Sequence, residues 1–186
     1  MGGLVALEGS ILLFIQNNLR NPVLTPVFQV ITALGDKGIF WILLTLLLLC
    51  FKKTRYIGLC SVAAMVLSVV INNLALKNLV ARTRPYELIE GLQLITTKPD
   101  DFSFPSGHSS LAFASAVAIC RTWKKRWTVW LLVLAALIAI SRLYVGVHFP
   151  TDVLFGVASG IACGFAGAYL GTRLWNRFRQ KRTSAG

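Results

Sequence analysis

The fold is decided by residues 127–175, which read WTVWLLVLAALIAISRLYVGVHFPTDVLFGVASGIACGFAGAYLGTRLW. Two apolar segments, 127–147 and 151–175, lie in this stretch on either side of a short polar turn. Each is long enough for an α-helix that crosses a bilayer, which needs about 20 predominantly apolar residues. The stretch therefore predicts two consecutive membrane-spanning helices.

The rest of the chain repeats this pattern. Further apolar segments occupy residues 38–51, 56–76 and 106–120, and together they leave no room for a separate soluble domain. Only 14% of the residues are charged, whereas about a quarter are charged in a typical soluble domain. We predict an all-α fold, a polytopic transmembrane helical bundle that forms one domain over residues 1–186.

The first 35 residues differ from the spanning segments. Polar residues, beginning with Glu8, interrupt the apolar side chains of residues 4–19, and this pattern suits a helix that lies at the membrane surface. Asn21-Pro22 then begins a second short helix, which runs to a break at residues 34–36. We expect residues 1–35 to be interfacial or partly inserted, residues 38–175 to form the transmembrane core, and residues 176–186 to form a basic cytoplasmic tail. The core then has five spanning helices, or six if part of the first region inserts.

The net charge of +12 lies in three clusters between or after the apolar segments. They hold 12 of the 19 basic residues and none of the seven acidic ones: Lys52, Lys53 and Arg55; Arg121, Lys124, Lys125 and Arg126; Arg173, Arg177, Arg179, Lys181 and Arg182. If the segments cross in alternation, all three clusters lie on one side, and the Lys/Arg-rich side of a membrane protein is cytoplasmic. This distribution argues against a nucleic-acid partner.

Three polar groups flank the spans on the opposite side. They are Lys77 with Arg84-Pro85, then Pro105-Ser106-Gly107-His108, then Ser141-Arg142 with His148 and Asp152. Ionisable residues at membrane depth are costly, so their gathering at one level indicates a functional site. Arg82 is the exception, because a single basic residue at a helix end commonly extends to the lipid headgroups.

These residue types suit phosphoryl transfer without a metal. Lys77, Arg84 and Arg142 provide cations for phosphate oxygens. Ser106 is placed to cap a helix whose free Gly107 and His108 N–H groups point toward an anion. Asp152, in the first turn after Pro150, is placed to fix one ring nitrogen of His148 and leave the other free to attack phosphorus. His108 then serves as the general acid.

The three groups resemble the three-part signature of the type 2 phosphatidic acid phosphatase (PAP2) family, and the resemblance extends over about residues 20–172. It implies a helical bundle that dephosphorylates lipid phosphates through a phosphohistidine, with no metal or cofactor. The family's nucleophile maps to His148, its orienting acid to Asp152 and its general acid to His108. Its phosphate ligands map to Lys77, Arg84, Ser106, Gly107 and Arg142.

Several alternatives stay open at this stage. Undecaprenyl diphosphate, phosphatidic acid and phosphatidylglycerophosphate all suit such a site, and we favour the isoprenoid diphosphate by family analogy. A non-catalytic lipid-phosphate binding or transport protein has no need of two histidines and an orienting carboxylate. A vanadium haloperoxidase-like protein shares the motifs, but those proteins are mostly soluble.

We expect a multi-pass protein of the inner (cytoplasmic) membrane, with its site facing the periplasm or exterior. We also expect the polar residues 86–103 to govern substrate choice.

Overall fold

The structure, a computed structural model, describes residues 2–183, with side chains up to Lys181. The helices and short helical turns of this part of the chain are α1 (Gly3–Leu19), α2 (Leu24–Gly35), η1 (Asp36–Gly38), α3 (Ile39–Cys50), α4 (Arg55–Ser68), η2 (Val69–Leu76), α5 (Lys77–Val80), α6 (Pro85–Leu88), α7 (Gly107–Trp123), η3 (Arg126–Thr128), α8 (Val129–Tyr144) and α9 (Pro150–Thr183). The predicted all-α fold is confirmed.

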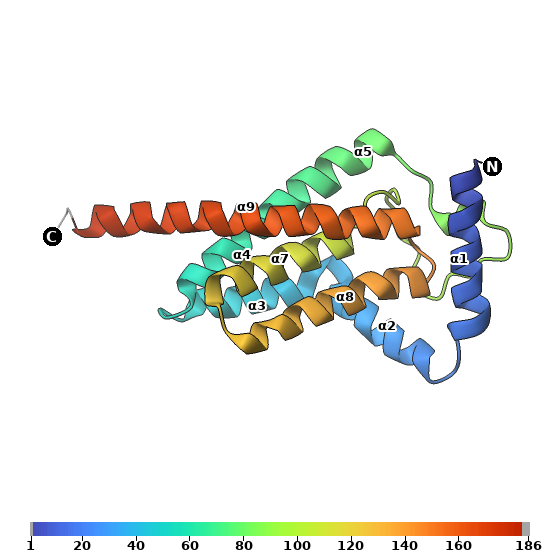
Figure 1. The fold of residues 1–186 in the computed structure, drawn as a ribbon, viewed down its shortest axis with the longest axis horizontal. Helices are drawn as coiled ribbons and strands as arrows, with labels where there is room; N and C mark the ends of the chain where they lie inside the picture. Colours follow the sequence, from blue (N-terminus) through green and yellow to red (C-terminus); the bar gives the residue numbers. More distant parts are fainter. Residues whose placement is uncertain (1, 184–186) are drawn as a thin grey trace.

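Five helical segments follow one another in alternating directions (Figure 1): α2 with α3, α4 with η2 and α5, then α7, α8 and α9. Four described segments are long and apolar enough to cross a membrane, namely Leu24–Cys50, Arg55–Leu88, Arg126–Tyr144 and Pro150–Lys181. The shorter α7 packs against α4, α8 and α9, and most of its side chains are buried. Large apolar side chains on the outside of the bundle, such as Leu46, Leu154 and Phe165, are exposed.

The glycines of α9 allow α4 and α7 to approach its backbone closely. A Cβ atom on Gly160 would lie 2.4 Å from the carbonyl oxygen of Ser110 in α7. One on Gly167 would lie 2.3 Å from the backbone nitrogen of Ala64 in α4. Small residues at such a spacing are typical of packed membrane helices. The glycines therefore serve packing.

The helix that begins at Arg55 runs further than the predicted segment 56–76 and changes its winding on the way. Its π-helical part, η2, contains Asn72, which is fully buried. The Asn72 amide donates to the Ser68 carbonyl (3.1 Å), and its Oδ1 accepts from Ser159 Oγ of α9 (2.6 Å). Such a π-helical turn shifts the register of the residues that follow. Lys77 is the first residue after this π-helical segment.

The first 35 residues form two different parts. Helix α1 lies crosswise at one end of the bundle (Figure 1), where the Arg20 guanidinium donates to the carbonyls of Tyr144 (2.8 Å) and Gln93 (2.7 Å). Its interfacial position stays a prediction. Helix α2 instead continues through η1 into α3 as one long apolar segment, which favours partial insertion for residues 24–35.

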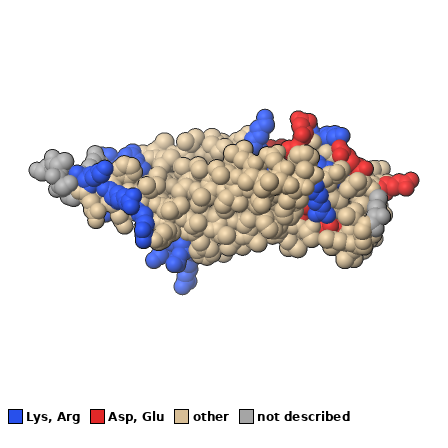
Figure 2. Space-filling view, turned by 90° about the horizontal axis from the view of Figure 1, so that it is seen from above, with Lys and Arg blue, Asp and Glu red and all other residues tan. Residues whose placement is uncertain are grey.

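Charge divides the molecule into two ends. Figure 2 shows lysine and arginine without acidic side chains at the end where α9 terminates, and acidic side chains together with further lysine and arginine at the opposite end. The turn between α3 and α4, the turn between α7 and α8, and the far end of α9 all lie at the basic end (Figure 1). The common side predicted for the three clusters is confirmed. Helix α9 also continues through residues 176–183 of the predicted tail, whereas residues 184–186 lie outside the described residues.

Candidate active site

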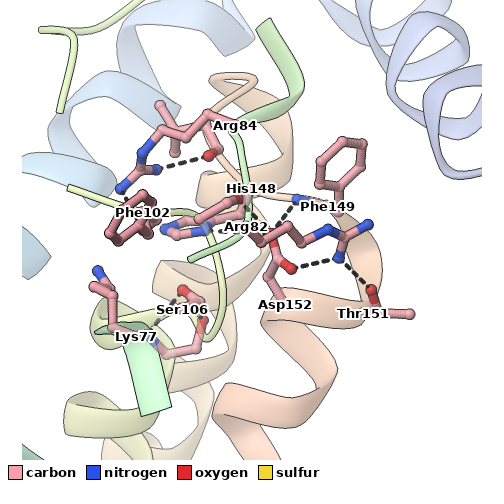
Figure 3. Close-up of polar contacts among 12 residues, drawn as sticks. Lys77, Arg82, Arg84, Phe102, Ser106, His148, Phe149, Thr151 and Asp152 are labelled. Carbon is pink, nitrogen blue, oxygen red and sulfur yellow. Dashed lines mark hydrogen bonds and ion pairs between the residues drawn. The ribbon is translucent and has the colours of Figure 1, made fainter. Parts of the chain in front are cut away.

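His148 lies in the turn between α8 and α9, beside the first turn of α9 (Figure 3). Helix α9 begins at Pro150, as predicted, and Asp152 is completely buried. Oδ2 of Asp152 accepts hydrogen bonds from the Phe149 N–H (2.9 Å) and the Ser103 hydroxyl (2.5 Å). A carboxylate in this position also interacts favourably with the helix dipole. The turn therefore fixes Asp152 next to His148.

The predicted hydrogen bond between His148 and Asp152 is not formed. Nδ1 of His148 lies 3.7 Å from Oδ2 of Asp152, which is longer than a hydrogen bond. Oδ2 already accepts from Phe149 and Ser103, and the buried Nδ1 has no hydrogen-bond partner among the described residues.

The surroundings of His148 nevertheless keep its imidazole neutral. Burial lowers the pKa of His148 to about 3, with Asp152 opposing this shift and the charges of Arg84 and Arg142 adding to it. With its proton on Nδ1, toward the carboxylate, the neutral ring has a lone pair on Nε2 for attack on an electrophile.

Arg82 does not extend to the lipid headgroups, so that expectation was wrong. Its Nη1 donates to Asp152 Oδ1 (2.6 Å) and Thr151 Oγ1 (2.8 Å), and its Nη2 donates to Glu8 Oε2 (2.5 Å). The guanidinium also lies over the Phe149 ring, 4.0 Å from its centroid (Figure 3). The reason is that the guanidinium pairs with two carboxylates, those of Asp152 and the buried Glu8. These two ion pairs stabilise the inward position of the Arg82 side chain.

Lys77 and Arg84 meet the carboxylate of Asp101, which comes from the loop before α7. Lys77 Nζ pairs with Asp101 Oδ2, and Arg84 Nη2 pairs with Oδ1. Arg84 is held further by the carbonyls of Val147 (2.7 Å) and Asp101 itself (2.8 Å). Burial by itself raises the pKa of Asp101, but Lys77 and Arg84 together lower it below its usual value. The ionised carboxylate of Asp101 therefore pairs with two of the three cations that were predicted to bind phosphate.

Arg142 and His108 meet at a second carboxylate, that of Asp36. Oδ1 of Asp36 lies 3.0 Å from His108 Nε2 and 3.8 Å from Arg142 Nη1. Arg142 Nη1 also donates to Thr32 Oγ1 of α2, whereas its buried Nε has no partner among the described residues.

Ser106 and Gly107 form the start of α7. Ser106 is its N-cap, as predicted, because the Ser106 hydroxyl accepts from the Ser109 N–H (3.4 Å). The Ser106 N–H donates to the Asp152 carbonyl (3.1 Å), which ties the start of α7 to the start of α9. A Cβ atom on Gly107 would lie 2.8 Å from Asn73 Oδ1, so a larger residue does not fit there without a shift.

A cavity of about 330 Å³ brings most of the predicted site together. Its lining includes five of the eight predicted residues, which are Lys77, Arg84, His108, Arg142 and His148. Ser106, Gly107 and Asp152 are not part of the lining. The cavity thus brings the three cations predicted to bind phosphate together with both histidines of the chain.

Comparison with known proteins shows the family of the chain. The family model of the PAP2 superfamily matches residues 57–177, which include all eight predicted site residues. The chain belongs to the PAP2 superfamily. An undecaprenyl-diphosphatase of Sulfolobus acidocaldarius is 39% identical over 116 residues, which are 62% of this chain and 56% of that protein. The PAP2 chain thus spans little more than half the length of this relative.

Two solved structures resemble this PAP2 chain over most of its length. The crystal structure of Aquifex aeolicus LpxE gives a TM-score of 0.74 at 32% identity, covering 85% of this chain and 92% of that one. The crystal structure of the first transmembrane PAP2-type phosphatidylglycerolphosphate phosphatase from Bacillus subtilis also gives 0.74, at 26% identity, covering 93% and 88%. The PAP2 chain is therefore a multi-pass membrane protein.

Sequence reasoning missed several polar residues of this PAP2 site: Glu8, Asp36, Arg82, Asp101 and Ser103. Glu8 did carry a signal, since a lone carboxylate within an apolar segment is rare and suggests a partner. The other four stand in loops or at helix ends, where charged and hydroxyl side chains are common.

Proposed function

We propose that this PAP2 chain is a metal-independent lipid phosphatase that transfers a phosphoryl group to His148 and then to water. The observation that carries the proposal is the cavity in which a buried, neutral His148 meets Lys77, Arg84 and Arg142. Cations placed around a phosphate stabilise the charge on its oxygens during transfer.

The reaction has two steps. First, Nε2 of His148 attacks phosphorus, the bond from phosphorus to the leaving oxygen breaks, and His108 gives that oxygen a proton. A water molecule then attacks the phosphohistidine, loses a proton to His108, and releases inorganic phosphate and neutral His148. Asp152 stabilises the positive charge that the His148 imidazole acquires when Nε2 forms its bond to phosphorus.

The substrate is a lipid phosphate, and we favour an isoprenoid diphosphate such as undecaprenyl diphosphate over phosphatidic acid or phosphatidylglycerophosphate. The similarity to the undecaprenyl-diphosphatase of Sulfolobus acidocaldarius supports this choice. Lys37 and Lys98 also line the cavity, beyond the three predicted phosphate ligands. Two additional cations suit a second phosphate group.

The site faces the periplasm or cell exterior. It lies at the end of the bundle opposite the three basic clusters, and the Lys/Arg-rich side of a membrane protein is normally cytoplasmic.

Phosphate release by purified protein in detergent tests the proposal, with undecaprenyl diphosphate, phosphatidic acid and phosphatidylglycerophosphate compared side by side. A radiolabelled substrate quenched during turnover should leave an acid-labile phosphoenzyme in the wild type and none in His148→Ala. A His148→Ala protein that still accumulates labelled enzyme would overturn the assignment of the nucleophile. Release of phosphate from none of the lipids would overturn the activity.

A further inference from the structure

The carboxylate of Asp36 connects the proposed general acid to a proposed phosphate ligand. Oδ1 lies 3.0 Å from His108 Nε2 and 3.8 Å from Arg142 Nη1. Asp36 is 72 residues away from His108 in the chain and belongs to none of the three motifs. Its position therefore results from the packing of η1 against α7.

The turn that carries Asp36 is shaped to fit against the first turns of α7. A Cβ atom on Gly35 would lie 3.1 Å from Cδ2 of the His108 ring. One on Gly38 would lie 2.2 Å from Cδ2 of Leu111, which follows His108 on α7. The backbone between them is left-handed, with φ values of 51° at Lys37 and 69° at Gly38. For a lysine this conformation costs about 1 kcal/mol or more and persists only when its surroundings hold it.

The geometry divides the two nitrogens of His108 between two tasks. The Cδ2 edge of the ring faces Gly35, and Nε2 meets the carboxylate. Nδ1 has no hydrogen-bond partner among the described residues, and His108 lines the cavity. A carboxylate accepts but does not donate, so Nε2 keeps its proton and Nδ1 is left to exchange one.

We propose that Asp36 is a positioning residue for His108, which it holds so that Nδ1 delivers the proton to the leaving oxygen. This inference rests on the proposed phosphatase function. In the first step the Nδ1 proton passes to the oxygen as its bond to phosphorus breaks, and His108 becomes a neutral ring with its proton on Nε2. In the second step Nδ1 takes a proton from the attacking water. Asp36 stays ionised throughout and accepts from Nε2 in both steps.

The test compares leaving groups that differ in their need for a proton. The variants are Asp36→Ala, Asp36→Asn, His108→Ala and the double variant Asp36→Ala/His108→Ala. Asp100→Asn is the matched control, because it removes a carboxylate from the same polar end and forms no ion pair with the site. The substrates are a long-chain alkyl phosphate, whose alcohol leaves poorly, and p-nitrophenyl phosphate, whose nitrophenolate leaves easily.

A lost general acid costs about 100-fold or more, so Asp36→Ala should lower kcat/KM for the alkyl phosphate by about 10- to 100-fold. Asp36→Asn keeps an acceptor oxygen without the charge and should lose less. kcat/KM for p-nitrophenyl phosphate, which reports only the steps up to the phosphoenzyme, should change less than about threefold, because its leaving group needs little protonation. In the His108→Ala background, Asp36→Ala should have no further effect on either substrate, since residues that act as a unit are not additive.

Equal losses of kcat/KM on both substrates, or a full additional loss in the double variant, would show a structural role and overturn the proposal. The proposed function is tested separately by the phosphoenzyme. Asp36→Ala should still accumulate it with p-nitrophenyl phosphate, whereas persistence of the phosphoenzyme in His148→Ala would contradict the mechanism itself. A variant that fails to bind inorganic phosphate has a damaged site, and if all Asp36 variants do so the positioning role is refuted.

Discussion

Asp101 should compete with phosphate for the cradle formed by Lys77 and Arg84. Its carboxylate pairs with both cations. A phosphoryl group that enters between these cations must displace the carboxylate or share its contacts. Asp101→Asn removes this competing charge, and the side chain keeps its size. The Asp101 carbonyl that accepts from Arg84 Nε (2.8 Å) is unaffected.

The magnitude follows from the exposure of the three side chains. Lys77 and Arg84 are 8% and 4% exposed, whereas Asp101 is 53% exposed and is screened by solvent. A solvent-exposed ion pair is worth about 0.2–1 kcal/mol, so the two pairs together contribute about 0.4–2 kcal/mol. Since 1.4 kcal/mol is a factor of ten, the affinity for phosphate should rise about 2- to 30-fold in Asp101→Asn.

The inhibition constant of inorganic phosphate measures this effect without knowledge of the natural lipid. It should fall in Asp101→Asn and stay unchanged in Asp100→Asn, the exposed neighbour without a contact to either cation. Because Lys77 and Arg84 lower the pKa of Asp101 below its usual value, the difference between wild type and variant should persist from pH 8 down to pH 5. An unchanged or higher inhibition constant in Asp101→Asn would refute the competition.

Four further predictions concern other parts of the molecule. Activity should survive excess EDTA and be inhibited by vanadate, since no group of three or more histidine, cysteine or acidic side chains among residues 2–183 is placed to hold a metal; loss that magnesium restores would contradict this. A single cysteine at position 100, in a cysteine-free background, should react with an impermeant maleimide in intact cells, and labelling only after lysis would reverse the proposed topology. Glu8→Gln should lower kcat more than it changes KM and destabilise the protein by about 1–3 kcal/mol, because Arg82 loses one of its two ionic partners. Thermal unfolding and kinetics that match the wild type would show that α1 does not support the site. The pKa of His148 is about 3 in the folded protein and about 6.5 in an unfolded chain, so the unfolded chain binds more protons between these two pH values. The free energy of unfolding should therefore fall by about 2 kcal/mol from pH 6.5 to 5. His148→Asn should remove this part of the pH dependence.

The motif residues could be predicted from the sequence because each stands beside an apolar segment. Lys77, His108 and Arg142 are ionisable groups at the ends of helices, where alternation of the spans brings them to one level, and the cavity contains all three. The N-cap at Ser106 and the helix start at Pro150 are local features with local signals. Residues 24–35 were harder to predict, because the break at residues 34–36 is typical of a helix end although the apolar segment continues into α3.

The partners of the charges required the tertiary structure. Arg82 is separated from Glu8 by 74 residues and from Asp152 by 70, and no periodicity links residues so far apart. By itself the sequence determined the helices, the end of the bundle at which the site forms, and the residues capable of chemistry, because apolar length, helix caps and charge placement are local properties. Only the packing of α1, η1 and the loop before α7 against the ends of the long helices decided which carboxylate each cation and each histidine meets. That choice depends on distances across the fold, where a buried charge is stable only beside a partner.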